Sequence, residues 1–244
     1  MAPPPALAEH VVCTWTAVHS GGPSGPVLPD GCVDVLWLDG SLVVAGPDTA
    51  PVFERELPDG ASIVGVRFRS GLAAAGLGVG VDDLRDTRTP LAAVWPAAEV
   101  DRLGSQLAQA ENPVPLLAAA VERHARPVSD SDRLVRAAVY RLRARSGRVA
   151  DLAGDLDVGD RRLHRRFSSA VGYGPKTLDR IFRFERFRRL AAAAPGPTSL
   201  AELAYTAGYS DQAHLTRECR RLAGDTPVRI VQDARSGGPI PSAV

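Results

Sequence analysis

Cysteine and lysine are both scarce in this sequence of 244 residues. The three cysteines, Cys13, Cys32 and Cys219, are too few and too scattered for a disulfide framework, so we expect a reducing compartment. Long apolar runs are missing as well, because none approaches the roughly 18–20 residues that span a bilayer. The first residues also lack the basic start and apolar stretch of a secretory signal. These absences predict a cytoplasmic protein with no membrane partner.

The motifs of the common enzyme classes are absent too. The sequence has no P-loop, no G-x-S-x-G and no H-E-x-x-H. The glycines of residues 76–80 superficially resemble a dinucleotide loop, but they follow no clear strand and lack the spacing of the third glycine. We interpret them as a glycine-rich helix end. We therefore expect no catalytic residues, no metal and no cofactor, and we predict that the protein is not an enzyme.

Charge divides the chain into two unlike halves. Residues 1–128 contain eight arginines and no lysine against fifteen acidic residues, a net charge of −7. Residues 129–244 contain twenty arginines and one lysine against thirteen acidic residues, a net charge of +8. A basic half joined to an acidic half indicates a polyanionic partner for the basic half, although solvated surface charge alone could produce such a split.

The acidic half begins with short β-prone runs between turn signals rich in glycine and proline. The runs predict strands at Val11–Val18, Val33–Leu38, Leu42–Ala45 and Ile63–Phe68, which favours a small sheet, sandwich or half-barrel. Apolar residues spaced by three and four then predict helices at Leu91–Trp95, Val100–Ala110 and Val114–His124. The polar segment Ala125–Ser131 marks the expected domain boundary.

The basic half has an almost wholly helical pattern. Asp132–Arg145 is amphipathic, and Leu178–Ala194 is a second long helix that ends at the proline-rich residues 195–197. The expected organisation is an effector or dimerisation domain over residues 1–128, a DNA-binding domain over residues 129–235 and a disordered tail over residues 236–244. The fold class is α+β.

Two segments of the basic half, residues 149–172 and 200–224, repeat one pattern. Each reads as a short helix, a three-residue turn and a second helix closed by glycine, the plan of a helix-turn-helix. Val158 and Tyr209 should fill the angle between the two helices of each unit. Ser210 is the expected N-cap of the later helix, and the weaker cap Gly159 stands at the equivalent position.

The second helix of each unit carries DNA-reading side chains. Arginine can bind guanine through two hydrogen bonds, glutamine can bind adenine, and further arginines can neutralise phosphates. An arginine-rich bundle with a solvated basic face is the alternative. The repetition at an offset of about 51 residues, from Leu152 to Leu203, favours paired helix-turn-helix units that bind double-stranded DNA.

These residues resemble the AraC/XylS family of bacterial regulators. The resemblance covers about residues 132–231 and rests on the runs 208–217, 223–227 and 163–167, together with Gly172 and Pro175. It implies two recognition helices that a long linking helix holds in successive major grooves, about 34 Å apart. It departs from the family pattern at Cys219, where the family usually has phenylalanine.

The resemblance also implies a role for each exposed position. The expected base contacts are Arg161, His164 and Arg165 in one groove and Gln212, Ala213, Thr216 and Arg217 in the other. Ala213 can offer only contact with a thymine methyl group. The expected phosphate contacts are Arg162, Arg166, Arg220 and Arg221. RNA polymerase is a further candidate partner of such a regulator.

The acidic half resembles the sensor domain of a subgroup of these regulators in high-GC actinobacteria. The resemblance rests on residues 29–37, 45–49 and 65–69 and implies a small cupin-like β unit followed by helices, with an unassigned ligand. It also implies a homodimer, which the apolar stripe of Val100–Ala110 supports, although packing within one monomer would explain that stripe equally well.

Candidate effector contacts are Trp15, Trp37, Arg67 and Arg69, although a structural core is the favoured role of the large aromatic residues. Arg67 and Arg69 alternate on one strand and could receive an anion, or pair with Asp30, Asp34 or Asp48, which we favour. A redox- or metal-responsive regulator that uses Cys13 and Cys32 is the alternative function. A DNA-repair enzyme of the kind that joins a zinc-cysteine domain to this helix-turn-helix is disfavoured, since its cysteine pairs are missing.

Overall fold

The computed structural model describes residues 1–19, 25–53, 57–144, 148–194 and 198–235, and the expected disordered tail lies outside these residues. The N-terminal half forms one antiparallel sheet with the strand order β1-β4-β2-β3-β5. Its strands are β1 (Val11–Val18), β2 (Asp34–Leu38), β3 (Ser41–Ala45), β4 (Ser62–Phe68) and β5 (Arg88–Pro90). The four predicted strands are confirmed to within a residue, and β5 is an addition.

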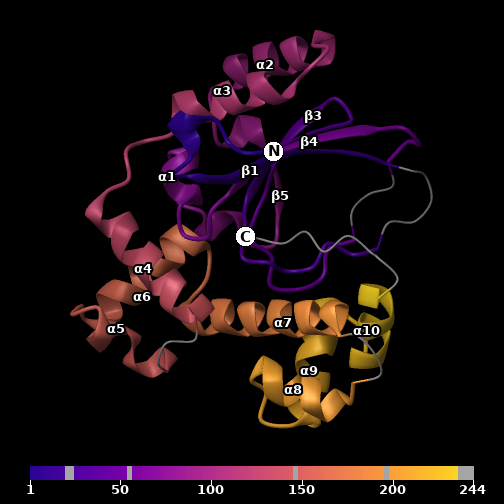
Figure 1. The fold of residues 1–244 in the computed structure, drawn as a ribbon. Coiled ribbons are helices and arrows are strands. Elements are labelled where there is room, and N and C mark those ends of the chain that lie inside the picture. Colours follow the sequence, from indigo (N-terminus) through magenta and orange to yellow (C-terminus); the bar gives the residue numbers. More distant parts are fainter. Residues whose placement is uncertain (20–24, 54–56, 145–147, 195–197, 236–244) are drawn as a thin grey trace.

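Helices cover one face of the sheet, as Figure 1 shows. They are α1 (Ala73–Leu77), α2 (Ala97–Gln109) and α3 (Val114–His124), with 3₁₀ turns η1 (Pro5–Leu7), η2 (Asp82–Leu84) and η3 (Leu91–Ala93). The predicted helix at Leu91–Trp95 is therefore only a 3₁₀ turn, because Pro96 follows at once and the chain restarts there as α2. The glycine-rich segment behaves as predicted, since α1 ends at Gly78 in the left-handed conformation.

Alternate strand residues supply the core of this half. Val35, Val44, Val64 and Val66 point inward and pack against Leu103, Leu107, Leu117 and Val121 of the covering helices. The apolar stripe of α2 is therefore buried within the monomer. It offers no free face to a second copy, so the expected homodimer loses its sequence support.

The C-terminal half is all helical and is organised around one long helix, α7 (Figure 1). Its elements are α4 (Asp130–Ala144), η4 (Val149–Asp151), α5 (Leu152–Asp155), α6 (Asp160–Val171), α7 (Pro175–Ala193), α8 (Leu200–Ala207), α9 (Gln212–Ala223) and α10 (Pro227–Arg235). The fully buried side chains of Leu178, Ile181, Phe184 and Phe187 run along α7 and form the centre of the second core. At 19 residues, α7 spans roughly 28 Å.

The junction between the halves is tightly bonded, although the sequence suggested a polar linker there. Ser129 and Asp132 cap the start of α4 reciprocally, with backbone-to-side-chain distances of 2.9 and 3.3 Å. Arg126 donates two hydrogen bonds, of 2.6 and 3.0 Å, to the carboxylate of Asp132. Burial opposes ionisation of Asp132, but the bonds from Arg126 and Ser129 outweigh it and hold the pKa at about 2.

Across the described residues, no helix is long and apolar enough to cross a membrane.

Candidate nucleic-acid interface

The two predicted helix-turn-helix units share one backbone geometry. In the first unit the Val158 amide donates to the Ala153 carbonyl at 3.0 Å, and in the second the Tyr209 amide donates to Ala204 at 2.9 Å. The residue before each donor is left-handed: Asp157 with φ 50° and Gly208 with φ 97°. Gly172 and Gly224 close the later helices in the same conformation. The units predicted over residues 149–172 and 200–224 are therefore present, and the turn residues Val158 and Tyr209 pack on the core.

The caps of the two recognition helices differ from one another. Gly159 is the N-cap of α6 and contributes no side-chain bond, as predicted. The cap of α9 is Asp211 and not Ser210, because the Asp211 carboxylate accepts the His214 amide at 2.6 Å. Ser210 instead lies beside the His214 ring, with Oγ 3.1 Å from Nδ1. The prediction for Ser210 was wrong by one residue, since both residue types cap well and only the local backbone chooses between them.

Helix α6 presents arginines away from the core. Leu163 and Phe167 face inward, while Arg161, Arg162 and Arg165 are exposed on the opposite side. Arg166 is half-buried. His164 is exposed but flanks this surface, since a β-carbon at Gly174 would lie 2.9 Å from its Nε2. The predicted DNA residues of this unit thus form one outward face, with His164 at its edge.

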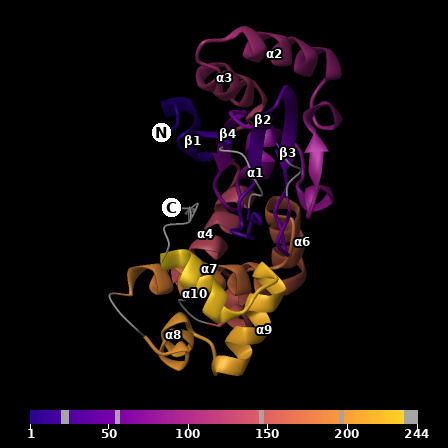
Figure 2. The same ribbon diagram turned by 90° about the vertical axis from the view of Figure 1, so that its right-hand side faces the viewer.

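Helix α9 presents a second such face. Leu215, Cys219 and Leu222 are buried, and Ala213, Arg217, Arg220 and Arg221 are exposed on the other side. Gln212 is exposed in the first turn. Thr216 is half-buried, and its hydroxyl donates to the Gln212 carbonyl at 2.9 Å. Cys219 is fully buried in the place where a larger residue was expected. In Figure 2, α6 and α9 both lie to the right of α4 and α8.

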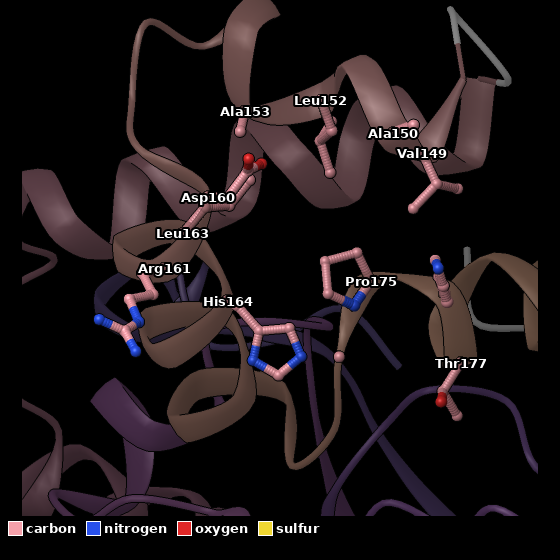
Figure 3. Close-up of a pocket in the computed structure, with 12 residues that line it drawn as sticks. Val149, Ala150, Leu152, Ala153, Asp160, Arg161, Leu163, His164, Pro175 and Thr177 are labelled. Carbon is pink, nitrogen blue, oxygen red and sulfur yellow. The ribbon is translucent and has the colours of Figure 1, made fainter.

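An open hollow of about 540 Å³ separates α6 from the start of α7, as Figure 3 shows. Val149 and Leu152 form one wall, and the His164 ring points toward Pro175 on the other side. Lys176, the single lysine of the chain, lines it and is exposed. The hollow therefore joins the arginine face of α6 to the amino end of a long helix, where anions are favoured. Lys176 could not be predicted as part of this surface from the sequence, because one isolated lysine carries no pattern.

An ion pair missed by the sequence analysis fastens the second unit to α7. Arg180 donates to both carboxylate oxygens of Glu218, with Nε and Nη2 at 2.8 and 2.7 Å. The Glu218 side chain is only 11% exposed. Burial raises the pKa of Glu218, but the two bonds from Arg180 outweigh it and lower the net value. The pair fixes the rotation of α9 on the linking helix, since it holds Glu218 against α7 while the neighbouring Arg217 stays exposed.

Trp15 and Arg67, two of the four predicted effector contacts, are bound to the protein itself. Arg67 pairs with Asp30 and Asp34, at 2.9 Å in each case, and Trp15 Nε1 donates to Asp34 at 3.1 Å. Burial alone would lower the pKa of Arg67, but the carboxylates of Asp34 and Asp30 raise it overall. The pairing favoured for Arg67 is therefore observed.

The other two predicted effector contacts lie elsewhere. Arg69 follows the end of β4 and donates to the Ala8 carbonyl at 3.3 Å. Trp37 lies on the opposite face of the sheet from Trp15, since Trp37 pairs with Val64 and Trp15 with the adjacent Gly65. The four residues therefore do not converge on one pocket.

The cysteines give little support to metal or redox sensing. Cys32 is buried, and this burial raises the pKa of its thiol well above the usual range. Cys13 is half-buried. His10 is buried, and its Nε2 lies 2.9 Å from the Arg126 carbonyl. Within the ranges that the structure describes, no three His, Cys, Asp or Glu residues form a group that could hold a metal.

Comparison with known domains gives two matches. Residues 152–232 match the family model of a helix-turn-helix domain, and residues 1–90 match a domain of unknown function, DUF6597. No curated protein matches the sequence significantly. Residues 152–232, within the C-terminal half, therefore form a helix-turn-helix domain.

Solved structures that resemble the whole chain include ToxT from Vibrio cholerae. ToxT of strain O395 is 14% identical, with a TM-score of 0.47, and the alignment covers 92% of this chain and 98% of that one. Wild-type ToxT of strain SCE256, bound to an unsaturated fatty acid, is 13% identical, with a TM-score of 0.40 and coverage of 89% and 93%.

Proposed function

We propose that this chain is a transcription regulator of the AraC/XylS type that binds a two-part DNA sequence through α6 and α9. The observation that carries the proposal is the repeated unit itself: two recognition helices of the same backbone geometry, each with arginines on its outward face. Arg161 and Arg165 would read one major groove, with Arg162 and Arg166 on its phosphates. Gln212 and Arg217 would read the next, together with Ala213 and Thr216, and Arg220 and Arg221 would bind phosphates.

Selection from random double-stranded DNA tests this proposal. We expect the full-length protein to enrich a motif of two short elements, one for each recognition helix. Because each neutralised phosphate contributes a slope of about −0.9, the four phosphate-binding arginines alone predict that log K falls with log salt at about −3.6 or more steeply. The binding constants would come from gel shifts on the enriched sequence. Failure to enrich any motif, or an affinity that is flat with salt, would contradict the proposal.

We further propose that the N-terminal half binds a small apolar effector on the outer face of the sheet. A cavity of about 320 Å³ lies there, with walls formed by Leu36, Leu38, Ser41, Val43, Val52, Phe53 and Arg88. Phe53 is 73% exposed, so an apolar ligand would cover a surface that otherwise contacts water. This cavity replaces the four effector residues that the sequence suggested.

A thermal-shift screen of metabolites against the full chain tests the effector proposal. A ligand present at about 100 times its dissociation constant should stabilise the protein by about 2.7 kcal/mol, which raises the melting temperature measurably. Val43→Trp should abolish that shift by filling the cavity, whereas Leu116→Trp, on the exposed surface of α3, should leave it intact. A ligand that stabilises wild type and Val43→Trp equally would place the effector site elsewhere.

A further inference from the structure

We propose that residues 46–52, here named the bridging segment, determine which spacing of the two DNA half-sites the protein accepts. The segment belongs to the N-terminal half, where it directly follows β3 and ends at Val52 in the wall of the cavity on the outer face of the sheet. It contacts the ends of both recognition helices. The inference rests on the proposed DNA-binding function and assigns to these residues a role in specificity.

The first contact is at the end of α6. Gly172 ends this helix with φ 90°, and Pro47 lies directly against it, since a β-carbon there would be 2.4 Å from Pro47 Cγ. The neighbouring loop adds a hydrogen bond, because the Val81 amide donates to the Ser169 carbonyl at 2.9 Å. The last turn of α6 is thus held by the N-terminal half at two adjoining points.

The second contact is at the end of α9. Gly224 ends this helix with φ 71°, and Pro51 lies close to it, since a β-carbon placed at Gly224 would be 3.6 Å from Pro51 Cγ. Pro47 and Pro51 are four residues apart, which limits their separation to roughly 14 Å. One short stretch of chain therefore lies beside both helix ends. Figure 1 shows the loops below the sheet lying along α7, between α6 and α10.

The bridging segment is itself firmly held. Asp48 is buried and pairs with both terminal nitrogens of Arg88 at 2.9 and 3.0 Å. The Thr49 amide donates to Asp86 at 2.6 Å, and the Gly46 amide donates to the Thr87 carbonyl at 3.0 Å. Val52 exchanges two backbone bonds with Val27, at 2.8 and 2.9 Å. Its two prolines further restrict the backbone. The segment can therefore transmit the position of the sheet to both helix ends.

The contacts of the bridging segment matter because α7 alone only loosely fixes the distance and rotation between α6 and α9. A long helix curves gently along its length, so a small change in the curvature of α7 would shift the units at its two ends relative to one another. One inserted base pair turns the second half-site by about 35° around the DNA axis. A protein whose recognition helices are also fixed at their far ends cannot follow that rotation. Removing the bridging contacts should allow it to follow.

The test measures spacing tolerance with the full chain. The DNAs are the selected sequence, the same sequence with one or two base pairs inserted between its elements, and a duplex that carries one element. The proteins are wild type, Pro47→Ala/Pro51→Ala, Asp48→Asn and the control Pro58→Ala. Pro58 is an exposed turn proline of the same half. Gel shifts at fixed salt give each dissociation constant, and thermal unfolding verifies that each variant is folded.

We expect wild type and Pro58→Ala to lose about tenfold or more in affinity on the inserted DNAs, and the bridging variants to lose about threefold or less. Binding to the single element should be equal for all four proteins. If the double proline variant does not fold, the loss of affinity that Asp48→Asn shows on the inserted DNAs tests the inference by itself. A bridging variant that folds and loses as much affinity on the inserted DNAs as wild type does overturns the inference, while the proposed function stands. Absence of specific binding by wild type overturns the proposed function itself.

Discussion

Replacing Glu218 with alanine should lower the free energy of unfolding by about 3 kcal/mol, because it leaves the guanidinium of Arg180 unpaired on α7. Breaking one partner of a buried pair typically costs about 3–5 kcal/mol, and we take the lower end because Arg180 remains 26% exposed. Chemical denaturation of the full chain measures the change. DNA binding by the second unit should weaken as well, since the pair sets the rotation of α9.

Two further variants define the origin of this loss. Glu122→Ala removes an exposed carboxylate of α3 and should change stability by less than about 0.5 kcal/mol. Arg180→Met/Glu218→Leu replaces both charges with apolar groups and should recover most of the loss, since two well-packed apolar side chains often equal a buried pair. A Glu218→Ala protein as stable as Glu122→Ala would show that the pair does not anchor α9.

The same pair predicts a dependence on pH. The pKa of Glu218 lies below its usual value of 4.5 in the folded protein. A carboxylate with a lowered pKa contributes its full stabilisation above the unfolded value and loses it as the pH falls through the folded value. The difference in stability between wild type and Glu218→Ala should therefore be constant near neutral pH and narrow below pH 4.5.

Replacing Arg217 with alanine should weaken binding to the selected DNA by about 1–3 kcal/mol, or roughly tenfold to hundredfold. Arg217 is exposed on the outward face of α9 and is expected to bind a base through two hydrogen bonds, so its loss should also relax base preference within one element. Arg165→Ala should do the same within the other element. Gel shifts on DNAs mutated at single positions measure both effects.

Arg102→Ala is the matched control, since Arg102 is exposed on α2 in the N-terminal half. It should bind as wild type does. If Arg217→Ala and Arg165→Ala both retained wild-type affinity and base preference at the same salt, the contacts inferred for α6 and α9 would be wrong. Arg220→Ala, by contrast, should weaken binding to all sequences alike, because a phosphate contact reads no base.

Local patterns were sufficient to predict much of this fold. The β-prone runs between turn signals located strands β1 to β4, and the glycines that close α6 and α9 ended the helices where expected. The exposed arginines of α6 and α9 followed from helical spacing alone. Strand β5 was missed because three residues that end in proline carry no periodic signal.

Contacts between distant segments were beyond the sequence analysis. Arg180 and Glu218 are 38 residues apart, and α7 contains so many arginines that none could be assigned a partner. Gly172 and Gly224 were recognised as helix caps, yet only the folded chain brings Pro47 and Pro51 against them. The pairing of Arg67 with Asp30 and Asp34 was favoured from the sequence, whereas the placement of Trp15 and Trp37 on opposite faces of the sheet depends on the register between distant strands.

Hydroxyl-radical footprinting of the full chain on its selected DNA tests the central claim most directly. Two recognition helices in successive major grooves predict two protected segments on one face of the DNA, with centres about 10–10.5 base pairs apart. Arg165→Ala should weaken protection of one segment and Arg217→Ala that of the other. A single protected segment, or loss of the same segment in both variants, would contradict the assignment of α6 and α9 as paired readers of one site.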